Sequence, residues 1–334
     1  MKIIVPMAGR GSRLRPHTLT IPKPLIPIAG KPIVHRLVED IASVCNEKVD
    51  EIAFIIGDFG IEVENNLISI AESLGAKGSI YHQEQALGTA HAILCAKDSL
   101  KGNVVVAFAD TLFKADFKLD NTSDGIIWVK QIEDPSAFGV VKLNEKNEIT
   151  DFVEKPDSYV SNLAIIGIYY FKSGEQLCGE LEFLIDNNIK DNGEYQLTNA
   201  LENMKNKGVV FKPGEVTEWL DCGNKDVTVN TNKKVLELNR EYSKEHSSEK
   251  FKNSVVVPPC FIGENVDLTN SIIGPYVSIG DNTKINNCVI KNTIIQENSC
   301  IENAVLNNSM IGNNACYIGQ EKDLSIGDYT EIKS

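Results

Sequence analysis

The segment Lys2-Ile3-Ile4-Val5-Pro6-Met7-Ala8-Gly9-Arg10-Gly11-Ser12-Arg13-Leu14 joins an apolar run to a turn that contains two glycines. We predict a strand over residues 3–8 and a loop directly after it. A glycine-rich turn at the end of a strand lets backbone N–H groups approach phosphate oxygens closely. The dinucleotide fingerprint would need a third glycine where Leu14 stands, and the Gly-Lys-Ser/Thr of a P-loop is absent. Four prolines follow and prevent a long helix there, at positions 16, 22, 24 and 27.

The charge of this segment differs from that of the rest of the chain. The 334 residues include 33 Lys and Arg against 46 Asp and Glu, for a formal net charge of -13, yet residues 1–36 hold seven basic residues and no acidic one. An acidic chain is poorly suited to a nucleic-acid duplex or an anionic membrane, so we expect neither as a partner. Positive charge beside the turn favours a small polyanion, such as a nucleoside triphosphate held by backbone amides, an Arg and a Lys. A solvated basic turn is the alternative from charge alone.

The first two thirds of the chain alternate apolar runs with amphipathic stretches. Strands are predicted over residues 52–56, 80–82 and 104–109, and helices over 33–45, 63–74 and 89–99. This alternation predicts a Rossmann-like α/β domain with a mainly parallel sheet covered on both faces. Further strands with fewer helices between them predict that the sheet becomes mixed, at residues 126–129, 140–143, 149–153 and 165–171. The predicted domains are 1–228, a helical linker over 229–252, and 253–334.

The last domain has a different period. From Ile262 to Ile311 an Ile or Leu recurs every five or six residues, and a glycine follows four of them. Three such steps make a coil of 16 or 17 residues, which is a solenoid period. The pattern resembles the hexapeptide-repeat left-handed parallel β-helix, with an antiparallel sheet as the alternative.

Two further observations bear on the location of the protein. No apolar run reaches the roughly 18 residues of a membrane span, and the run at residues 3–5 is too short for a signal-peptide core. The eight cysteines include no C-x-x-C pair. We therefore expect reduced thiols and a cytoplasmic protein.

The N-terminal segment also carries a longer pattern. Gly9-x-Gly11-x-Arg13-Leu14-x-Pro16-x-Thr18-x-x-x-Pro22-Lys23 resembles the signature of the sugar-1-phosphate nucleotidyltransferases, which include glucose-1-phosphate thymidylyltransferases and uridylyltransferases. Further motifs follow in the family's order: Gln83 with Leu87-Gly88-Thr89-Ala90, Asp110, Phe138-Gly139-Val140-Val141, Glu154-Lys155-Pro156, Gly193-Glu194-Tyr195 and Trp219-Leu220-Asp221. The resemblance covers roughly residues 1–228. It implies an enzyme that transfers a nucleoside monophosphate from an NTP to a sugar 1-phosphate and releases pyrophosphate.

The resemblance also implies roles for individual residues. The nucleotide would be bound by Ala8, Gly9, Gly11, Arg13, Lys23, Gln83, Gly88 and Thr89, and the sugar phosphate by Gly139, Glu154, Lys155, Asn162 and Glu194. Arg13, Lys23 and Asp110 would act in catalysis, and Asp110 and Asp221 would hold Mg²⁺, which suits two carboxylates completed by phosphate oxygens and water. The attacking phosphate is already anionic near neutral pH, because its second pKa is about 6, so no general base is required.

Several alternatives stay open on substrate and activity. Gln83 favours a pyrimidine, hence dTTP or UTP with glucose 1-phosphate. Gly88-Thr89-Ala90 is spelled as in guanylyl and some uridylyl members of the family, so a mannose-1-phosphate guanylyltransferase that uses GTP is an alternative. A non-catalytic regulatory or scaffold relative is a second alternative, although such relatives tend to lose the Arg, Lys or Asp that this chain keeps. An acyltransferase site in the β-helix is disfavoured because residues 253–334 contain no His. Stacked coils need a cap or a partner at their terminal edge, so we expect a homo-oligomer formed through the β-helix.

Overall fold

The structure is a computed structural model that describes residues 1–9, 11–156, 158–243, 251–320 and 325–331 of the chain. The chain forms two compact units: unit 1 comprises residues 1–26 and 31–224, and unit 2 comprises residues 27–30 and the chain from Lys225 onward. Arg10 and residues 244–250 of the predicted linker lie outside the described residues. The division at residues 228 and 252 stays a prediction.

Unit 1 contains a nine-stranded sheet in the order β10-β9-β11-β6-β1-β4-β5, with β8 pairing β11 and β12. Its strands are β1 (Lys2–Pro6), β4 (Glu51–Ile56), β5 (Lys77–His82), β6 (Val104–Ala107), β8 (Gly125–Gln131), β9 (Val140–Leu143), β10 (Ile149–Val153), β11 (Leu163–Phe171) and β12 (Phe211–Glu215). Strands β6, β1, β4 and β5 are parallel, whereas β11 runs antiparallel to both β6 and β8. The predicted mixed sheet is thereby confirmed.

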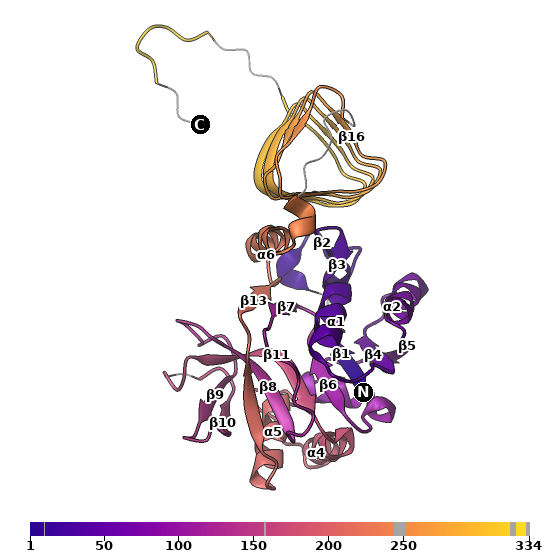
Figure 1. Cartoon of the computed structure of the whole chain (residues 1–334), viewed down its shortest axis with the longest axis vertical. Coiled ribbons are helices and arrows are strands. Elements are labelled where there is room, and N and C mark those ends of the chain that lie inside the picture. Colours follow the sequence, from indigo (N-terminus) through magenta and orange to yellow (C-terminus); the bar gives the residue numbers. More distant parts are fainter. Residues whose placement is uncertain (10, 157, 244–250, 321–324, 332–334) are drawn as a thin grey trace. The chain divides into compact units, whose positions relative to one another are not determined.

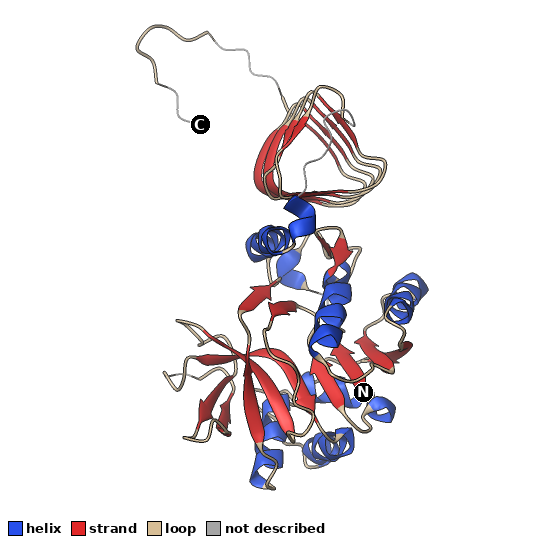
Figure 2. Cartoon of the chain, in the orientation of Figure 1, coloured by secondary structure: helices blue, strands red, loops and turns tan. Residues whose placement is uncertain are grey.

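Helices cover both faces of the sheet (Figure 2). They are α1 (Ile33–Val44), α2 (Ile61–Ser73), α3 (Thr89–Leu94), α4 (Gly174–Asp186) and α5 (Leu197–Asn206), with short 3-10 turns η1 (Ser12–Leu14), η2 (Lys23–Leu25) and η3 (Lys97–Ser99). Ile4 and Val106 of the sheet share one core with Ile93 of α3 and Leu181 of α4. Neighbouring strand residues such as Ile3 are also fully buried. Because alternate residues of a strand face opposite sides, burial of both sets means that each face is packed.

The order of the strands reverses at β1. The chain continues from β1 to β4 and β5 on one side, and later returns to place β6 on the other side. In open α/β sheets, ligands bind beyond the carboxyl ends of the strands at such a reversal. There β1 leads into the glycine-containing loop, and β6 leads to Asp110. A second pair of strands, β7 (Thr111–Lys114) and β13 (Glu218–Asp221), sets Thr111 opposite Asp221.

Unit 2 is built from short parallel strands that wind into a coil of triangular outline (Figure 1). Its strands are β14 (Val255–Val256), β15 (Cys260–Ile262), β16 (Asp267–Thr269), β17 (Ile272–Ile273), β18 (Val277–Ile279), β19 (Lys284–Asn286), β20 (Val289–Ile295), β21 (Cys300–Glu302), β22 (Val305–Ile311) and β23 (Cys316–Ile318). Ile262 pairs with Ile279, which pairs with Ile295, which pairs with Ile311. The predicted period of 16 or 17 residues is confirmed, and the left-handed winding stays a prediction.

The remaining elements are divided between the two units. Unit 2 also holds β2 (Pro27–Ile28), α6 (Lys225–Leu238) and η4 (Arg240–Ser243), and unit 1 holds β3 (Lys31–Pro32). None of the helices in the described ranges is long and apolar enough to cross a bilayer.

Asparagines stand at the corners of the β-helix. Asn265, Asn282, Asn298 and Asn314 occupy equivalent places in successive coils, and each has a φ between 53° and 56°. Asn adopts this left-handed conformation more readily than most residues other than Gly. The side-chain amide of Asn265 donates to Asn282 at 3.2 Å, and that of Asn282 donates to Asn298 at 3.3 Å. The polar residues between the apolar positions therefore have a structural role.

Candidate active site

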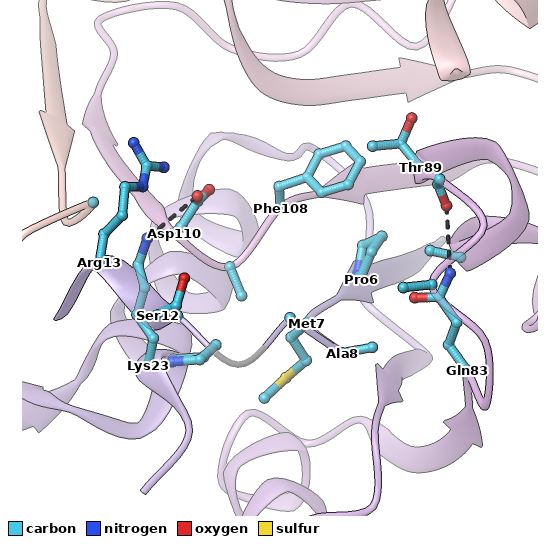
Figure 3. A pocket seen from close by; sticks show the side chains of 18 of the residues that line it. Pro6, Met7, Ala8, Ser12, Arg13, Lys23, Gln83, Thr89, Phe108 and Asp110 are labelled. Carbon is cyan, nitrogen blue, oxygen red and sulfur yellow. Dashed lines mark hydrogen bonds and ion pairs between the residues drawn. The ribbon is translucent and has the colours of Figure 1, made fainter. Parts of the chain in front are cut away.

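A cleft of about 480 Å³ lies at the carboxyl ends of β1 and β6 (Figure 3). Gln83 and Thr89 lie at one end of this view, and Arg13, Lys23 and Asp110 lie at the other. All eight residues predicted to bind the nucleotide line the cleft, namely Ala8, Gly9, Gly11, Arg13, Lys23, Gln83, Gly88 and Thr89. Residues separated by up to 81 positions are thus brought to one cavity by the folding of the sheet.

The loop after β1 packs directly against Lys23. Gly11 has a φ of 64°, and a Cβ atom at this position would lie 2.7 Å from the Cβ of Lys23. The hydroxyl of Thr18 donates to the carbonyl oxygen of Gly11 at 2.8 Å, and buried Leu14 anchors η1. Glycine at position 11 is therefore needed for packing within the protein, and this packing fixes where the lysine side chain begins.

Lys23 is a buried cation in the wall of the cleft. Its side chain is 8% exposed, and its Nζ lies 3.3 Å from Oδ2 of Asp110. The ion pair is drawn as a dashed line in Figure 3. A buried ammonium group in a confined cleft interacts more strongly with a ligand's negative charge than a solvated one does, because water screens it less.

A second carboxylate lies close to Asp110. The backbone N–H of Cys222 donates to the carbonyl oxygen of Asp110 at 3.2 Å, which holds Asp221 beside it. Burial raises the pKa of Asp221, and the negative charge of Asp110 raises it further, whereas the charges of Lys23 and Arg13 lower it. Two carboxylates flanked by two cations thus line this region.

These two carboxylates fit a magnesium site. In the described ranges no cluster of three or more His, Cys, Asp or Glu side chains that could hold a metal is present. Mg²⁺ usually takes only one or two protein carboxylates and completes its six positions with water and substrate phosphates. Burial and the charge of Asp110 disfavour the ionised form of Asp221, and a divalent cation would stabilise that form.

A second cleft of about 350 Å³ shares Arg13, Thr89, Phe108 and Asp110 with the first. Glu154 lines it, and burial raises the pKa of this carboxyl group, an effect that Lys155 partly offsets. Gly139 lines it as well, and a Cβ atom there would lie 3.0 Å from Oε2 of Glu154. The absence of a side chain at position 139 therefore keeps the carboxylate accessible.

The other predicted sugar-binding residues are placed differently. Lys155 directs an exposed side chain, 64% accessible, to within 3.8 Å of Glu154. Glu194 lines the first cleft instead of the second. Asn162 lines neither of the two clefts, and its backbone carbonyl accepts a hydrogen bond from Ile132 at the edge of β11.

The second cleft also contains Thr198, which no motif in the sequence singled out, beside the motif residues Phe138 and Trp219. Thr198 is buried, and its hydroxyl has no hydrogen-bond partner among the residues that the structure describes. A buried hydroxyl without a partner costs free energy until a ligand group pairs with it. Trp219 stacks edge-on against Phe138 with ring centroids 4.7 Å apart. Thr198 lies four residues after Glu194, just beyond the Gly193-Glu194-Tyr195 motif, and this proximity is the signal that could have identified it.

Comparisons with known proteins identify relatives of this chain. The family model described as Nucleotidyl transferase matches residues 2–237. The low-salt glycan biosynthesis nucleotidyltransferase Agl11 of Haloferax volcanii is 31% identical over 246 residues, which cover 71% of this chain and 66% of that protein. The bifunctional protein GlmU of Methanococcus maripaludis is 33% identical over 225 residues, which cover 67% of this chain and 51% of that protein. The chain thus spans about half to two thirds of the length of these curated relatives.

A solved structure is similar as well. A UDP-glucose pyrophosphorylase complexed with UDP-glucose superposes with a TM-score of 0.58 at 25% identity, covering 71% of this chain and 99% of that one.

Proposed function

The chain belongs to the nucleotidyl transferase family, and from that premise we propose that it transfers a nucleoside monophosphate from an NTP to a sugar 1-phosphate and releases pyrophosphate. The observation that carries the proposal is that two clefts share Arg13 and Asp110 in their walls, with Lys23 paired to that aspartate. Two anionic substrates bound in these clefts would meet at the shared residues.

The reaction needs positioning and charge neutralisation more than proton transfer. A phosphate oxygen of the sugar phosphate attacks the α-phosphorus, and the bond from that phosphorus to the oxygen bridging to the β-phosphate breaks. The bridging oxygen leaves with pyrophosphate and carries the bond's electron pair. Lys23 and Arg13 stabilise the negative charge that develops, and the backbone amides after β1 bind the triphosphate.

Magnesium completes the proposed site. Asp110 and Asp221 would hold the ion, and when bound it supplies positive charge to the phosphate oxygens. The two cations are placed differently. Lys23 is fixed by its packing against the loop, whereas Arg13 lines both clefts.

The proposed nucleotide is UTP or dTTP and the proposed sugar is glucose 1-phosphate. Gln83 at the wall of the first cleft supports a pyrimidine, and the similarity to a pyrophosphorylase complexed with UDP-glucose supports both choices. In the second cleft, Glu154 and Gly139 would contact the sugar hydroxyls and Lys155 would meet the sugar phosphate. Glu194 lines the first cleft and Asn162 lines neither cleft, so their positions do not support a role in this sugar site.

Pyrophosphate release tests this proposal directly. The full chain with Mg²⁺ is incubated with each of UTP, dTTP, GTP, CTP and ATP, combined with glucose 1-phosphate or mannose 1-phosphate. We expect the fastest release with UTP or dTTP and glucose 1-phosphate. Release only with GTP and mannose 1-phosphate would overturn the substrate assignment, and no release with any pair would overturn the enzyme itself.

Lys23→Ala tests the mechanism. Removing a cation that stabilises the transition state is expected to lower kcat by more than a hundredfold. Lys31→Ala is the matched control, because Lys31 belongs to the same basic segment but pairs with Glu39 at 2.8 Å outside both clefts. A Lys23→Ala enzyme with the wild-type rate would contradict the assigned role.

Three further assignments belong to the same proposal. Residues 1–228 would form the catalytic domain, the β-helix would mediate a homo-oligomer, and the protein would act in the cytoplasm. The eight cysteines, all within the described residues, form no disulfide bond with one another, as expected for a protein in a reducing compartment. Four stacked aliphatic side chains exposed on the β-helix support self-association, namely Val255, Ile272, Val289 and Val305.

A further inference from the structure

The side-chain amide of Gln83 is held by two protein groups. Gln83 directly follows β5, where its backbone N–H donates to the carbonyl of Ile56 at 2.8 Å. Its side chain lines the first cleft, and its Nε2 lies 3.4 Å from the carbonyl oxygen of Gly88 and 3.1 Å from Nδ1 of His91. Both partners belong to the start of α3, so one turn of chain surrounds the NH₂ end of the amide.

These contacts determine which way the amide faces. A carbonyl oxygen accepts hydrogen bonds and never donates, so the NH₂ group of Gln83 must be the end that faces Gly88. His91 must then accept at Nδ1, which places the proton of the neutral ring on Nε2. Burial lowers the pKa of His91 and so favours that neutral ring near neutral pH. The polar atom of Gln83 that remains for a ligand is Oε1.

We infer that His91 is a positioning residue for nucleotide choice: it holds the amide of Gln83 so that Oε1 faces the base, which selects bases with a ring N–H beside a carbonyl. This inference rests on the proposed function. Uracil and thymine present N3–H next to O4, whereas cytosine presents an unprotonated N3 next to an amino group. An accepting oxygen pairs with the ring N–H of the former and opposes the ring lone pair of the latter. The purines differ in the same way: guanine has N1–H next to O6, whereas adenine has an unprotonated N1 next to an amino group.

Without the histidine, rotation of the amide would cost less, because only the Gly88 carbonyl would oppose it. Only the 3.4 Å contact to Gly88 would then keep the NH₂ end in place, and a contact of this length is weak. A rotated amide presents NH₂ to the base and pairs with cytosine. His91 therefore acts on discrimination between bases and leaves the reacting phosphates untouched.

The test compares His91→Phe, which keeps a ring but removes the acceptor, with His91→Asn, whose Oδ1 stands near the place of Nδ1. For the full-length wild type and both variants, kcat and KM are measured with UTP and with CTP at saturating glucose 1-phosphate. The wild type is expected to prefer UTP. In His91→Phe, the ratio of kcat/KM for UTP to that for CTP should fall about tenfold, through a change in KM with kcat nearly unchanged. His91→Asn should retain the wild-type ratio.

A binding measurement separates this inference from the proposed function. Dissociation constants of UMP and CMP are measured by calorimetry for the same proteins, with His91→Leu as a second variant in case His91→Phe does not fold. If the wild type turns over no substrate pair, the proposed function fails, and the ratio of the two constants still tests the role of His91. An unchanged ratio in a folded variant without the acceptor overturns the inference. Equal loss of kcat with both nucleotides indicates a structural role and also overturns it.

Discussion

Gly9 and Gly88 both line the nucleotide cleft, and a methyl group would have opposite consequences at the two positions. At Gly88, where φ is 115°, an added Cβ would lie 2.4 Å from the backbone oxygen of Tyr195. At Gly9, no described heavy atom lies within 4 Å of the added Cβ. We expect Gly88→Ala to lose a few kcal/mol of unfolding free energy, because both strain and a backbone clash arise.

Gly9→Ala should keep its Tm and raise the KM for the NTP at least tenfold, since its methyl group would keep the phosphates from the loop amides. Thermal melts and initial rates of both variants check this pair. A Gly9→Ala protein with the wild-type KM would show that the phosphates do not approach position 9.

Glu154 is expected to link stability to pH. Its folded-state pKa is raised from the ordinary 4.5 by burial, so the ionised carboxylate is less favourable in the folded chain than in the unfolded one. The stability that protonated Glu154 contributes to the folded state is therefore fully present below pH 4.5, the pKa of the unfolded chain. This contribution is lost as the pH rises through the raised pKa of the folded state. Glu154→Gln should accordingly melt at a higher temperature than the wild type at pH 7, and the difference should shrink as the pH falls to 4.5.

Melting curves at the two pH values check this expectation, with the exposed Glu145→Gln as a control for the loss of one negative charge. A wild type that melts above Glu154→Gln at pH 7 would contradict it. If Glu154 also contacts the sugar, the variant should combine higher stability with a raised KM for the sugar phosphate.

The eight residues that the sequence predicted to bind the nucleotide all line one cleft, because the motif residues of the N-terminal loop are contiguous and those near residue 88 follow a single strand. The prediction was less complete for the second cleft, whose walls come from β11, β13 and the start of α5. Thr198 and His91 went unnoticed because a hydroxyl without a partner and a side chain that orients another are visible only when spatial neighbours are known.

Among the elements, α4 offers a clear test of capping. The hydroxyl of Ser173 at its N-cap accepts the backbone N–H of Gln176 at 3.1 Å. Ser173→Ala should therefore lower the unfolding free energy by about 1 kcal/mol. Ser69→Ala is the control, because the exposed Ser69 only bonds back to Asn65 within α2.

Urea unfolding followed by tryptophan fluorescence measures both variants. The chain has two tryptophans, and both Trp128 and Trp219 lie in unit 1, as does α4. Equal stabilities of the two variants would show that the cap contributes nothing measurable.

Elements with clear periodicity were predicted closely, and those without it were missed. Strands β9 and β10 have the predicted bounds because their β-branched runs stand between turn residues. The predicted helix over 89–99 instead ends at Leu94 and is followed by η3. Strand β12 contains Pro213 and Gly214, which are unfavourable inside a strand. They are tolerated because, among the described strands, β12 is an edge strand that pairs with β8.

For the whole molecule, we expect self-association through the stacked aliphatic side chains of the β-helix. Val289 lies in this row and is 45% exposed. Placing a charge there by Val289→Lys should convert the oligomer to a 36.8 kDa monomer in light scattering at micromolar concentration, since a buried unpaired charge opposes association. Asn286→Lys adds the same charge on another side of the coil and should leave the oligomer intact. A monomeric wild type would contradict the expectation.

The two-part organisation was predictable at this scale because the parts differ in period. The isoleucines of the β-helix recur with the same number of residues that one coil contains. The sequence alone therefore predicts that Ile279 pairs with Ile295 in the next coil. The boundary was harder to place. The polar surface of α6 resembles that of a linker, yet Asn232 is completely buried and accepts a hydrogen bond from Ser278 in the β-helix.

The regular stacking of the β-helix has a mechanical consequence. In the described part of the β-helix, each strand of a coil pairs with the coil before it and the coil after it, so a force applied at the C-terminal end would act first on β22 and β23. The coils would then detach in sequence. Each coil of 16 or 17 residues would release about 55–60 Å of extended chain. Under tension, this part of the molecule should lengthen in nearly equal steps, each equal to one turn of the coil.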